Sequence, residues 1–297
     1  MPKYVIVGAC AAGIGAVEAI REVDPDGAIT VISEEVCSQY SRPMISDFVS
    51  GKADLEKMKT RDDQFWTKNN VQALTGKKAV KLNTAKKTVS LDSGDKVTYE
   101  KLLIATGGKP FVPKMEGSDK EGVFTFTNIS DAERLAAKID AVKAQKAVVI
   151  GAGLIGISVT EALVKRGLQV TLVELQDKIL SLILDPKASD IVEGIIRKAG
   201  VNIVTGQSVQ RIVGNPEDDH VVGGVVLTKG EQMPCDLVIV AIGVIPRTEL
   251  VVGTDVKTNR GIIVDNYMQT NIPDVYASGD VAEAYDFILN QNRLLPL

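Results

Sequence analysis

Short hydrophobic runs joined by an amphipathic stretch occur twice along the chain. In the first half, the apolar runs 4–7 and 29–33 flank a stretch with helical periodicity. In the second half, the runs 147–150 and 169–174 flank another such stretch. Apolar runs of four to six residues that alternate with helical stretches are typical of buried parallel strands joined by helices. The pattern therefore predicts two copies of a β-α-β unit.

Each unit is followed by shorter apolar runs separated by turn residues, which predicts an antiparallel meander in each half. The expected strands are 77–82, 87–91, 96–99, 209–213 and 221–227. Each half then closes on a similar phrase, an apolar run that ends in glycine and has a proline three residues later. These phrases run from Leu102 to Gly107 and from Leu237 to Gly243. The repetition predicts two structurally similar domains.

A helix between the halves and a final segment determine the expected domain layout. Ser130 and Glu133 have the spacing of a capping box, which would open a helix that ends near Lys143. After Gly243 no third repeat begins, and one more strand is expected near 261–265. The simplest layout is an α/β fold of two Rossmann-like domains, each with a central parallel sheet and a small antiparallel meander, the second inserted into the first. The expected domains are 1–112 with 245–297, and 113–244.

Composition and charge narrow the classes of function. Of 297 residues 45% are hydrophobic, and the net charge of -4 leaves no basic excess for binding nucleic acid. The longest apolar stretches, 147–157 and 237–246, are shorter than the roughly 20 residues that span a bilayer. No signal-peptide pattern precedes Tyr4. The three cysteines form neither a CxxC pair nor an even disulfide set, so we expect a reducing, cytoplasmic location.

The turn of the second unit carries a dinucleotide-binding pattern. Its three glycines form a complete GxGxxG between a predicted strand and helix, and Glu174 ends the next strand roughly 20 residues later. Such glycines allow a tight turn and close approach of a pyrophosphate to the helix N-terminus. Glu174 can accept hydrogen bonds from ribose hydroxyls and would repel a 2′-phosphate, so NADH is predicted over NADPH, although Lys178 is nearby. The residues assigned to NADH are Gly151, Gly153, Leu154, Ile155, Gly156, Glu174 and Gly243.

The turn of the first unit, residues 8–13, is a weaker copy of the same pattern. Cys10 stands where the second glycine is expected. A cysteine side chain is small enough to leave the backbone amides accessible, and Glu34 follows the second strand as an acidic residue should. We interpret Cys10 as a tightly packed small residue without a redox role.

Two further segments carry a resemblance to a known family. The sequence TNIPDVYASGDV at 270–281 and the triplet Ala105-Thr-Gly107, together with both glycine turns, resemble the pyridine nucleotide-disulfide oxidoreductase superfamily of FAD enzymes. The matching segments lie between residues 4 and 284. The resemblance implies that Asp280 hydrogen-bonds the ribityl chain of FAD. It also implies that the amide of Val281, at a helix start, lies near the flavin pyrimidine ring, where a positive dipole stabilises the reduced flavin.

The segment Tyr40-Ser-Arg-Pro-Met44 is similar to one found in rubredoxin reductases, ferredoxin reductases and the flavin domains of NADH-dependent nitrite reductases. The resemblance implies that Arg42 lies beside the FAD pyrophosphate and that Val80 presents backbone to the adenine. A solvated arginine and an ordinary strand residue are the alternatives. The residues assigned to FAD are Gly8, Cys10, Ala12, Gly13, Glu34, Arg42, Pro43, Val80, Ala105, Thr106, Gly107, Gly279, Asp280 and Val281.

The resemblance implies an NADH-dependent FAD oxidoreductase. Hydride would pass from NADH to FAD, and electrons would then pass to rubredoxin, a ferredoxin-like protein, a partner redox subunit or oxygen; no side chain is assigned a catalytic role, because the flavin carries the chemistry. Relatives that act on disulfides or peroxide have a cysteine where this chain has Arg42 and Pro43, so Cys37 and Cys235 are interpreted as non-catalytic. A slow redox-sensing protein and a thiol-dependent disulfide reductase are the alternatives.

The chain departs from its relatives at two places, and one histidine is left without a role. Ser158 stands where many relatives have a glutamate near the nicotinamide. The lone His220 lies in a polar loop and is assigned no role, and no metal site is predicted. Relatives continue beyond the segment that resembles 293–297 into a helix beside the flavin and a third, interface-forming domain. We therefore expect a truncated chain, or one subunit of a homo- or hetero-oligomer whose partner supplies the missing wall.

Overall fold

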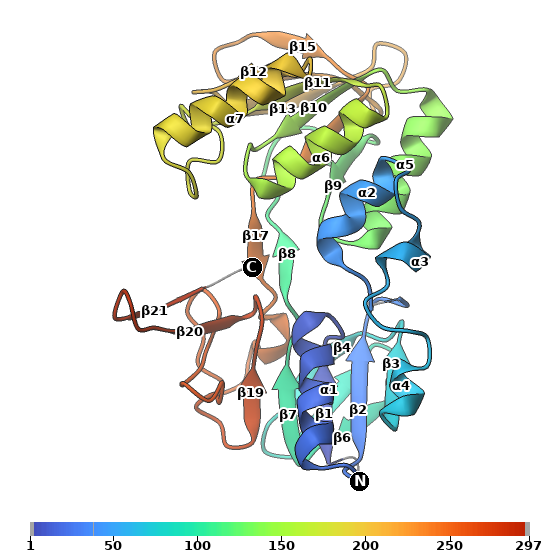
Figure 1. Cartoon of the computed structure of the whole chain (residues 1–297), viewed down its shortest axis with the longest axis vertical. Helices are drawn as coiled ribbons and strands as arrows, with labels where there is room; N and C mark the ends of the chain where they lie inside the picture. The colour runs from blue at the N-terminus through green and yellow to red at the C-terminus, as the bar shows by residue number, and fades with distance from the viewer. Residues whose placement is uncertain (1–2, 38, 295–297) are drawn as a thin grey trace. The chain divides into compact units, whose positions relative to one another are not determined.

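The computed structural model describes residues 3–37 and 39–294 and divides into two compact units (Figure 1). The first comprises Met1–Tyr40, Lys59–Lys109 and Ile245–Leu297, and the second comprises Ser41–Met58 and Pro110–Val244. The elements of the first unit are β1 (Tyr4–Val7), α1 (Ala11–Val23), β2 (Ile29–Ser33), α4 (Phe65–Lys68), β3 (Val71–Thr75), β4 (Ala79–Asn83), β5 (Thr88–Leu91), β6 (Lys96–Thr98), β7 (Lys101–Ile104), η2 (Glu249–Val251), β18 (Ile262–Ile263), β19 (Val275–Ala277), β20 (Ala282–Asp286) and β21 (Gln291–Leu294). The elements of the second unit are η1 (Arg42–Met44), α2 (Ile45–Val49), α3 (Leu55–Met58), β9 (Val123–Thr125), α5 (Ile129–Val142), β10 (Lys146–Ile150), α6 (Leu154–Lys165), β11 (Gln169–Val173), α7 (Pro186–Lys198), β12 (Asn202–Val204), β13 (Val209–Gly214), β14 (Val222–Leu227), β15 (Gln232–Pro234) and β16 (Leu237–Val240). The connecting strands β8 (Gly108–Pro110) and β17 (Val244–Pro246) pair with each other.

The first unit has a parallel sheet in the order β19-β7-β1-β2-β3. Successive residues of β1 point to opposite faces, and the core divides accordingly. Ile6 packs with Ile14 of α1 on one face. Val5 packs with Val89 of the antiparallel sheet β4-β5-β6 on the other face. Because both faces are covered, the inner strands β1, β2 and β7 are mostly apolar, as buried parallel strands are.

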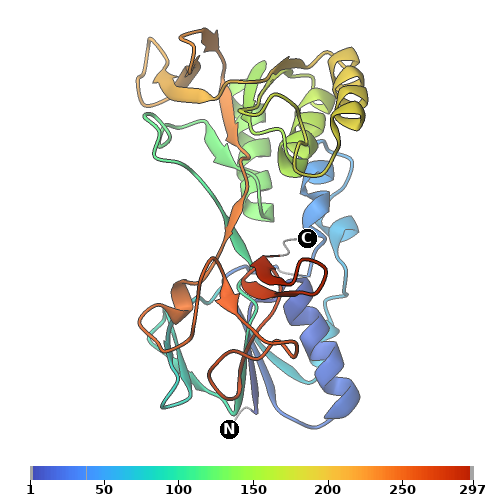
Figure 2. The same cartoon turned by 90° about the vertical axis from the view of Figure 1, so that its left-hand side faces the viewer.

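The second unit repeats this arrangement with a parallel sheet in the order β12-β11-β10-β16-β9. Helix α6 contacts β10 and β11, and α7 contacts β12. The antiparallel sheet β13-β14-β15 lies on the other face (Figure 2). Its Val225 and Leu227 belong to the same core cluster as Val148 and Val238 of the parallel sheet. The five expected antiparallel strands are present, each within two residues of its predicted ends. The predicted fold class is confirmed.

The segment Ser41–Met58 belongs to the second compact unit, although the expected domain ranges placed it in 1–112. Helix α2 contacts α5 and α6. In addition, Arg166 Nη1 donates a hydrogen bond to the carbonyl oxygen of Val49 at 3.1 Å. These contacts join residues more than 80 positions apart, so no local pattern in the sequence indicates them.

The start of helix α5 differs from the predicted capping box of Ser130 and Glu133, which is wrong. The N-cap is Asn128, whose side chain accepts a hydrogen bond from the Asp131 N–H at 2.8 Å. The Asp131 carboxylate in turn accepts from the Thr127 N–H at 2.9 Å. Asn128 thus caps one helix amide, Asp131 fixes the residue before the cap, and the helix begins with a cap two residues earlier than predicted.

The segment after β19 also differs from prediction. Val281 was expected at a helix start, but the chain instead enters β20, which pairs antiparallel with β21. Glu283 at the start of this hairpin is buried and accepts hydrogen bonds from the N–H groups of Arg260 and Gly261 and from the Asn259 side chain. The expected helix dipole near Val281 is therefore absent from the described residues, and the helix-start prediction is wrong.

Candidate dinucleotide sites

The two glycine turns occupy equivalent places at the carboxyl ends of the two central strands. In the first unit, the Gly8 N–H donates to Ile32 O at 2.8 Å. In the second unit, the Gly151 N–H donates to Val173 O, also at 2.8 Å. The first residue of each turn is thus hydrogen-bonded to the neighbouring strand, Gly8 to β2 and Gly151 to β11. The closing phrases meet the turns in the same way, because the N–H groups of Ala105 and Ala241 donate to the last residues of β1 and β10.

The first and third positions of each turn have no room for a side chain. A Cβ at Gly8 would lie 2.0 Å from Ala105 O, and one at Gly151 would lie 2.6 Å from Ala241 O. The third glycines are equally restricted, since a Cβ at Gly13 or Gly156 would lie 2.0 or 1.8 Å from the carbonyl oxygen of the first glycine of its own turn. These four glycines are required by the close approach of backbone to backbone.

The second position is different in both turns. A Cβ at Gly153 would meet no atom within 4 Å. Its backbone angles, φ -79° and ψ -173°, nearly match those of Cys10, φ -87° and ψ -161°. This extended conformation is open to any residue. Cysteine at position 10 is therefore compatible with the same turn, and open space adjoins the backbone of the second turn where a pyrophosphate would lie.

The helices that follow the two turns lack side-chain caps. Neither Cys10 at the start of α1 nor Gly153 at the start of α6 makes a side-chain cap hydrogen bond. In contrast, α5 and α7 are capped by Asn128 and Asp185. The first amides of a helix have no intrahelical acceptor and attract anions. The uncapped starts of α1 and α6, next to the glycine turns, fit the phosphates of a dinucleotide.

Glu174 is held beside the second turn by two backbone donors. Its Oε2 accepts the Ala152 N–H at 2.7 Å, and its Oε1 accepts the Gln176 N–H at 2.9 Å. Each carboxylate oxygen has a further lone pair for a ribose hydroxyl. Lys178 forms an ion pair with Asp190, and this hydrogen bond raises the pKa of Lys178. The cation that could have attracted a 2′-phosphate is thus already paired, which fits the predicted preference for NADH.

In the first unit, Glu34 has two cationic partners that the sequence did not indicate. Arg247 forms an ion pair with one carboxylate oxygen, and Lys78 Nζ lies 3.8 Å from the other. Arg247 also joins the closing phrase to this corner, because its N–H donates to Gly107 O at 2.9 Å and its carbonyl accepts from the Thr106 hydroxyl at 2.8 Å. In the sequence, Arg247 is marked only by its place directly after Pro246 of the repeated glycine-proline phrase, and this place does not indicate Glu34 as its partner.

Asp280 and Gly279 lie on the loop that follows β19. A Cβ at Gly279 would lie 3.2 Å from the Cβ of Ala12, so this loop adjoins the first glycine turn. Asp280 is half-buried, and no described residue forms a hydrogen bond or ion pair with its carboxylate. Val281 is fully buried. A half-buried carboxylate that the protein leaves unpaired fits a hydroxyl-bearing ligand, because burial without a partner is costly.

The other residues assigned to FAD lie in different places. Val80 is on β4 and is 49% exposed, two residues from Lys78. Arg42 and Pro43 begin η1 in the second unit, where Arg42 Nη1 donates to Thr127 O at 2.8 Å. Thr127, whose carbonyl accepts this hydrogen bond, is itself held by the bond from its N–H to the Asp131 carboxylate. The contacts of Arg42 and Val80 with FAD stay predictions.

The remaining residues assigned to NADH lie at the second turn. Leu154, at the start of α6, is 66% exposed, and Ile155 beside it is half-buried. Gly243 has φ +117°, which favours glycine, and its carbonyl accepts the Phe111 N–H at 3.0 Å. Ser158, the position noted in the sequence, lies in α6.

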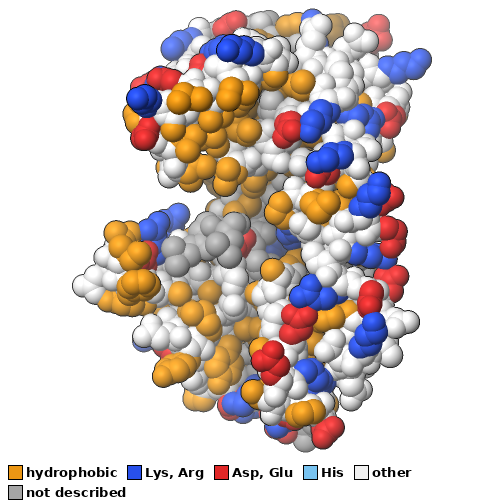
Figure 3. Space-filling view, viewed as in Figure 1, with side chains coloured by type: hydrophobic (Ala, Val, Ile, Leu, Met, Phe, Trp, Pro, Cys, Tyr) orange, Lys and Arg blue, Asp and Glu red, His pale blue; other side chains and the backbone are white. Residues whose placement is uncertain are grey.

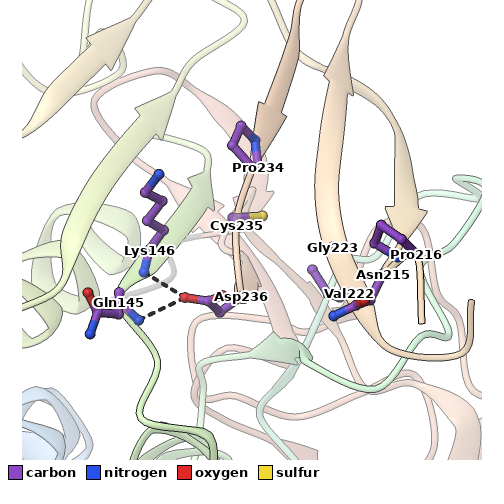
Figure 4. Close-up of a pocket in the computed structure, with 9 residues that line it drawn as sticks. All are labelled: Gln145, Lys146, Asn215, Pro216, Val222, Gly223, Pro234, Cys235 and Asp236. Atoms are coloured by element: carbon purple, nitrogen blue, oxygen red, sulfur yellow. Dashed lines mark hydrogen bonds between the residues drawn. The ribbon is translucent and has the colours of Figure 1, made fainter. Parts of the chain in front are cut away.

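Cys37 is partly buried and Cys235 is buried. The burial of Cys235, and to a smaller extent the negative charge of Asp236, raise the pKa of its thiol to about 12. It lines a hollow of about 390 Å³ whose Asp236 accepts the N–H groups of Gln145 and Lys146 at 2.8 and 2.9 Å (Figure 4). Burial also raises the pKa of Cys37. The thiolate is the reactive form of cysteine, and burial disfavours that form at both positions.

A cluster of metal ligands and a membrane-spanning helix are both absent from the described residues. No group of three or more His, Cys, Asp or Glu residues there could hold a metal ion. No helix among the described residues is long and apolar enough to cross a membrane. His220 is exposed in the turn before β14.

Comparisons with known proteins identify the family of this chain. The family model described as pyridine nucleotide-disulphide oxidoreductase matches residues 2–293. The NADH-dependent phenylglyoxylate dehydrogenase subunit epsilon of Aromatoleum evansii is 37% identical over 99% of this chain and 69% of that protein. Rubredoxin-NAD(+) reductase of Pseudomonas putida is 32% identical over 94% of this chain and 72% of that protein. A solved covalent putidaredoxin reductase-putidaredoxin complex contains a chain of 28% identity and TM-score 0.92, over 99% of this chain and 71% of that one. The resemblance predicted from the sequence is confirmed.

Proposed function

Because the chain belongs to the pyridine nucleotide-disulphide oxidoreductase family, it is an oxidoreductase, and we propose that it transfers a hydride from NADH to FAD and then electrons to a redox protein or partner subunit. We assign FAD to the first unit and NADH to the second. The observation that carries the assignment is the pair of equivalent glycine turns, each followed by an uncapped helix and each near an acidic residue.

The residues of the first unit would hold FAD through backbone and carboxylate groups. The amides at the start of α1 would bind the pyrophosphate, and Glu34 would accept the hydroxyls of the adenosine ribose. The unpaired Asp280 carboxylate would accept a hydroxyl of the ribityl chain. Once FAD is bound, it supplies the acceptor for the hydride and the route for electrons to leave.

The residues of the second unit would bind and orient NADH. The amides at the start of α6 would bind its pyrophosphate, and the Glu174 carboxylate, held by Ala152 and Gln176, would accept the ribose hydroxyls. Both donors to Glu174 are backbone groups of fixed position, so the carboxylate is oriented before the nucleotide arrives. Such orientation reduces the free energy needed to order the site on binding.

The electron acceptor is proposed to be a protein. The relatives reported above include a reductase named for rubredoxin, a reductase solved with putidaredoxin and a subunit of a larger enzyme. A thiol-dependent reaction is disfavoured because burial raises the pKa values of both Cys37 and Cys235.

Rapid mixing tests this proposal. The purified protein is loaded with FAD, reduced with NADH without oxygen, and mixed with rubredoxin, ferredoxin, oxygen or a disulfide. We expect rapid flavin reduction by NADH and fastest reoxidation by one of the iron proteins. Fastest reoxidation by oxygen would replace the proposed acceptor, and reoxidation only by the disulfide would favour the thiol mechanism. A protein that binds both cofactors but does not turn over with any acceptor would instead be a redox sensor.

A cytoplasmic location is part of the proposal. Its support is that none of the cysteines among the described residues forms a disulfide, as in proteins of a reducing compartment. Fractionation of the native host, with the protein detected by antibody, tests it. Recovery with the periplasmic or extracellular fraction would contradict it.

A further inference from the structure

Helix α7 of the second unit presents large apolar side chains to solvent. Ile191 and Ile195, one turn apart, are 60% and 62% exposed, whereas Ser189 on the opposite side of the helix is fully buried. Just before the helix, Leu182 and Ile183 are also exposed. We call these four residues the α7 face. Hydrophobic side chains gather over this part of the unit (Figure 3). Contiguous exposed apolar groups of this kind mark interaction surfaces.

The sequence of α7 is poorly suited to an isolated surface helix. Isoleucine and glycine are both weaker helix formers than alanine, and glycine in a helix interior costs about 1 kcal/mol. Gly194 nevertheless lies between the two exposed isoleucines, and a Cβ there would meet no atom within 4 Å. No contact inside the unit therefore requires glycine at this position. A glycine on an exposed apolar face allows another backbone to approach closely.

Charges around Gly194 indicate what that other backbone is. Asp190 and Lys198 lie four residues before and four residues after Gly194, so a two-fold axis at Gly194 would place Asp190 of one helix opposite Lys198 of an antiparallel copy, and the reverse. Within the described residues Lys198 has no ion pair, and Asp190 pairs only with Lys178. An interface of this symmetry uses one self-complementary surface on both subunits.

We propose that the α7 face binds a second copy of this chain through antiparallel pairing of the two α7 helices. The backbones would meet at Gly194. Ile191 and Ile195 of each copy would pack on the apolar face of the other. Asp190 would keep Lys178 of its own chain on one carboxylate oxygen and face Lys198 of the other copy with the second, and the two Asp190–Lys198 pairs would set register and orientation. Leu182 and Ile183 would extend the apolar contact beyond the helix.

Charge reversal tests both the surface and its symmetry. Asp190→Lys places two like-charged pairs in a homodimer, and so does Lys198→Asp. An equimolar mixture of the two variants restores two opposite-charged pairs. Glu133→Lys is the matched control, since Glu133 is exposed on α5 and its reversal changes a surface charge of the same unit. Molecular mass is measured by sedimentation from about 1 to 100 μM, the range of moderate affinities. Circular dichroism and FAD content verify that each variant folds.

The proposal expects a concentration-dependent dimer for wild type and for Glu133→Lys. Each reversed variant should dissociate at least tenfold more readily, and mixing the two should recover wild-type association. A wild type that stays monomeric throughout would overturn the proposal, as would a dimer that both reversed variants retain. Because mass is measured without NADH or acceptor, failure here leaves the proposed redox function unaffected, and failure of turnover leaves this inference unaffected.

Discussion

Alanine substitutions at two glycines of the second turn should have different effects: Gly156→Ala should lower the stability of the fold, and Gly153→Ala should weaken NADH binding. At Gly156 the new methyl carbon would lie 1.8 Å from Gly151 O, where ordinary contacts begin near 3.4 Å. The obstructing atom is backbone and cannot rotate away. Overpacking typically costs about 1–3 kcal/mol, and we expect the upper end of that range for Gly156→Ala. For a domain of this size the melting temperature should fall by about 6 °C or more.

Gly153→Ala should have the opposite profile. The new methyl carbon meets no protein atom within 4 Å, and the backbone angles of Gly153 are available to alanine. The loss of glycine at an N-cap should cost under about 1 kcal/mol. The methyl group would, however, occupy the space proposed for the NADH pyrophosphate. We expect the Kd for NADH to rise at least about tenfold, which corresponds to about 1.4 kcal/mol.

Three measurements on each variant decide the matter: thermal unfolding, FAD content and NADH titration under anaerobic conditions. Gly15→Ala is the control, because Gly15 lies inside α1 with open space around it; alanine there should stabilise by about 0.5–1 kcal/mol and leave NADH binding unchanged. If Gly153→Ala bound NADH as wild type does, the second turn would not be the pyrophosphate site. If Gly156→Ala were as stable as wild type, the steric argument would be refuted.

Further predictions concern single side chains. Asp280→Ala should lower FAD occupancy by about tenfold in equilibrium dialysis without lowering the melting temperature of the apoprotein, because no described residue bonds its carboxylate. Glu174→Ala should narrow the ratio of Kd values for NADPH and NADH at least about fivefold, as like-charge repulsion is removed; an unchanged ratio counts against the assignment. Cys37→Ser should leave flavin reduction by NADH intact in stopped flow, since its thiol pKa is raised. Burial would raise the pKa of Glu283, but the N–H of Gly261 and the other donors lower it overall. The ionised Glu283 carboxylate therefore stabilises the folded protein above the ordinary pKa of glutamate. This stabilisation is lost as the pH falls through the lowered pKa of Glu283 in the folded state. Glu283→Gln should therefore destabilise by about 2 kcal/mol at pH 7 and progressively less in acid melts.

The repeated strands and turns could be predicted because each is encoded locally. Buried parallel strands are continuous apolar runs, and the obligatory glycines follow them directly. The start of α5 shows where such local reasoning becomes ambiguous. Asn128 with Asp131, and Ser130 with Glu133, both have capping spacing, and only the packed structure shows that the first pair is used.

The segment after β19 was mispredicted although a signal was present. Residues 282–286 alternate between small apolar and polar or aromatic side chains, a pattern typical of a strand, and a second short run follows at 291–294. The family resemblance of Gly279 and Asp280 favoured a helix instead. The partners of Glu34 could not be predicted for another reason: Arg247 is more than 200 residues away and approaches only through the insertion of one domain into another.

The two turns also show that the glycine pattern combines two separate constraints. The first and third glycines are required by backbone oxygens 1.8 to 2.6 Å from any Cβ, whether or not a nucleotide binds. The second position is unconstrained by the protein, because Gly153 and Cys10 share an extended conformation with room for a side chain. Only a ligand close to the backbone would require glycine there. Cys10 therefore leaves the fold of the first turn intact, and the size of the residue at this position bears on the cofactor alone.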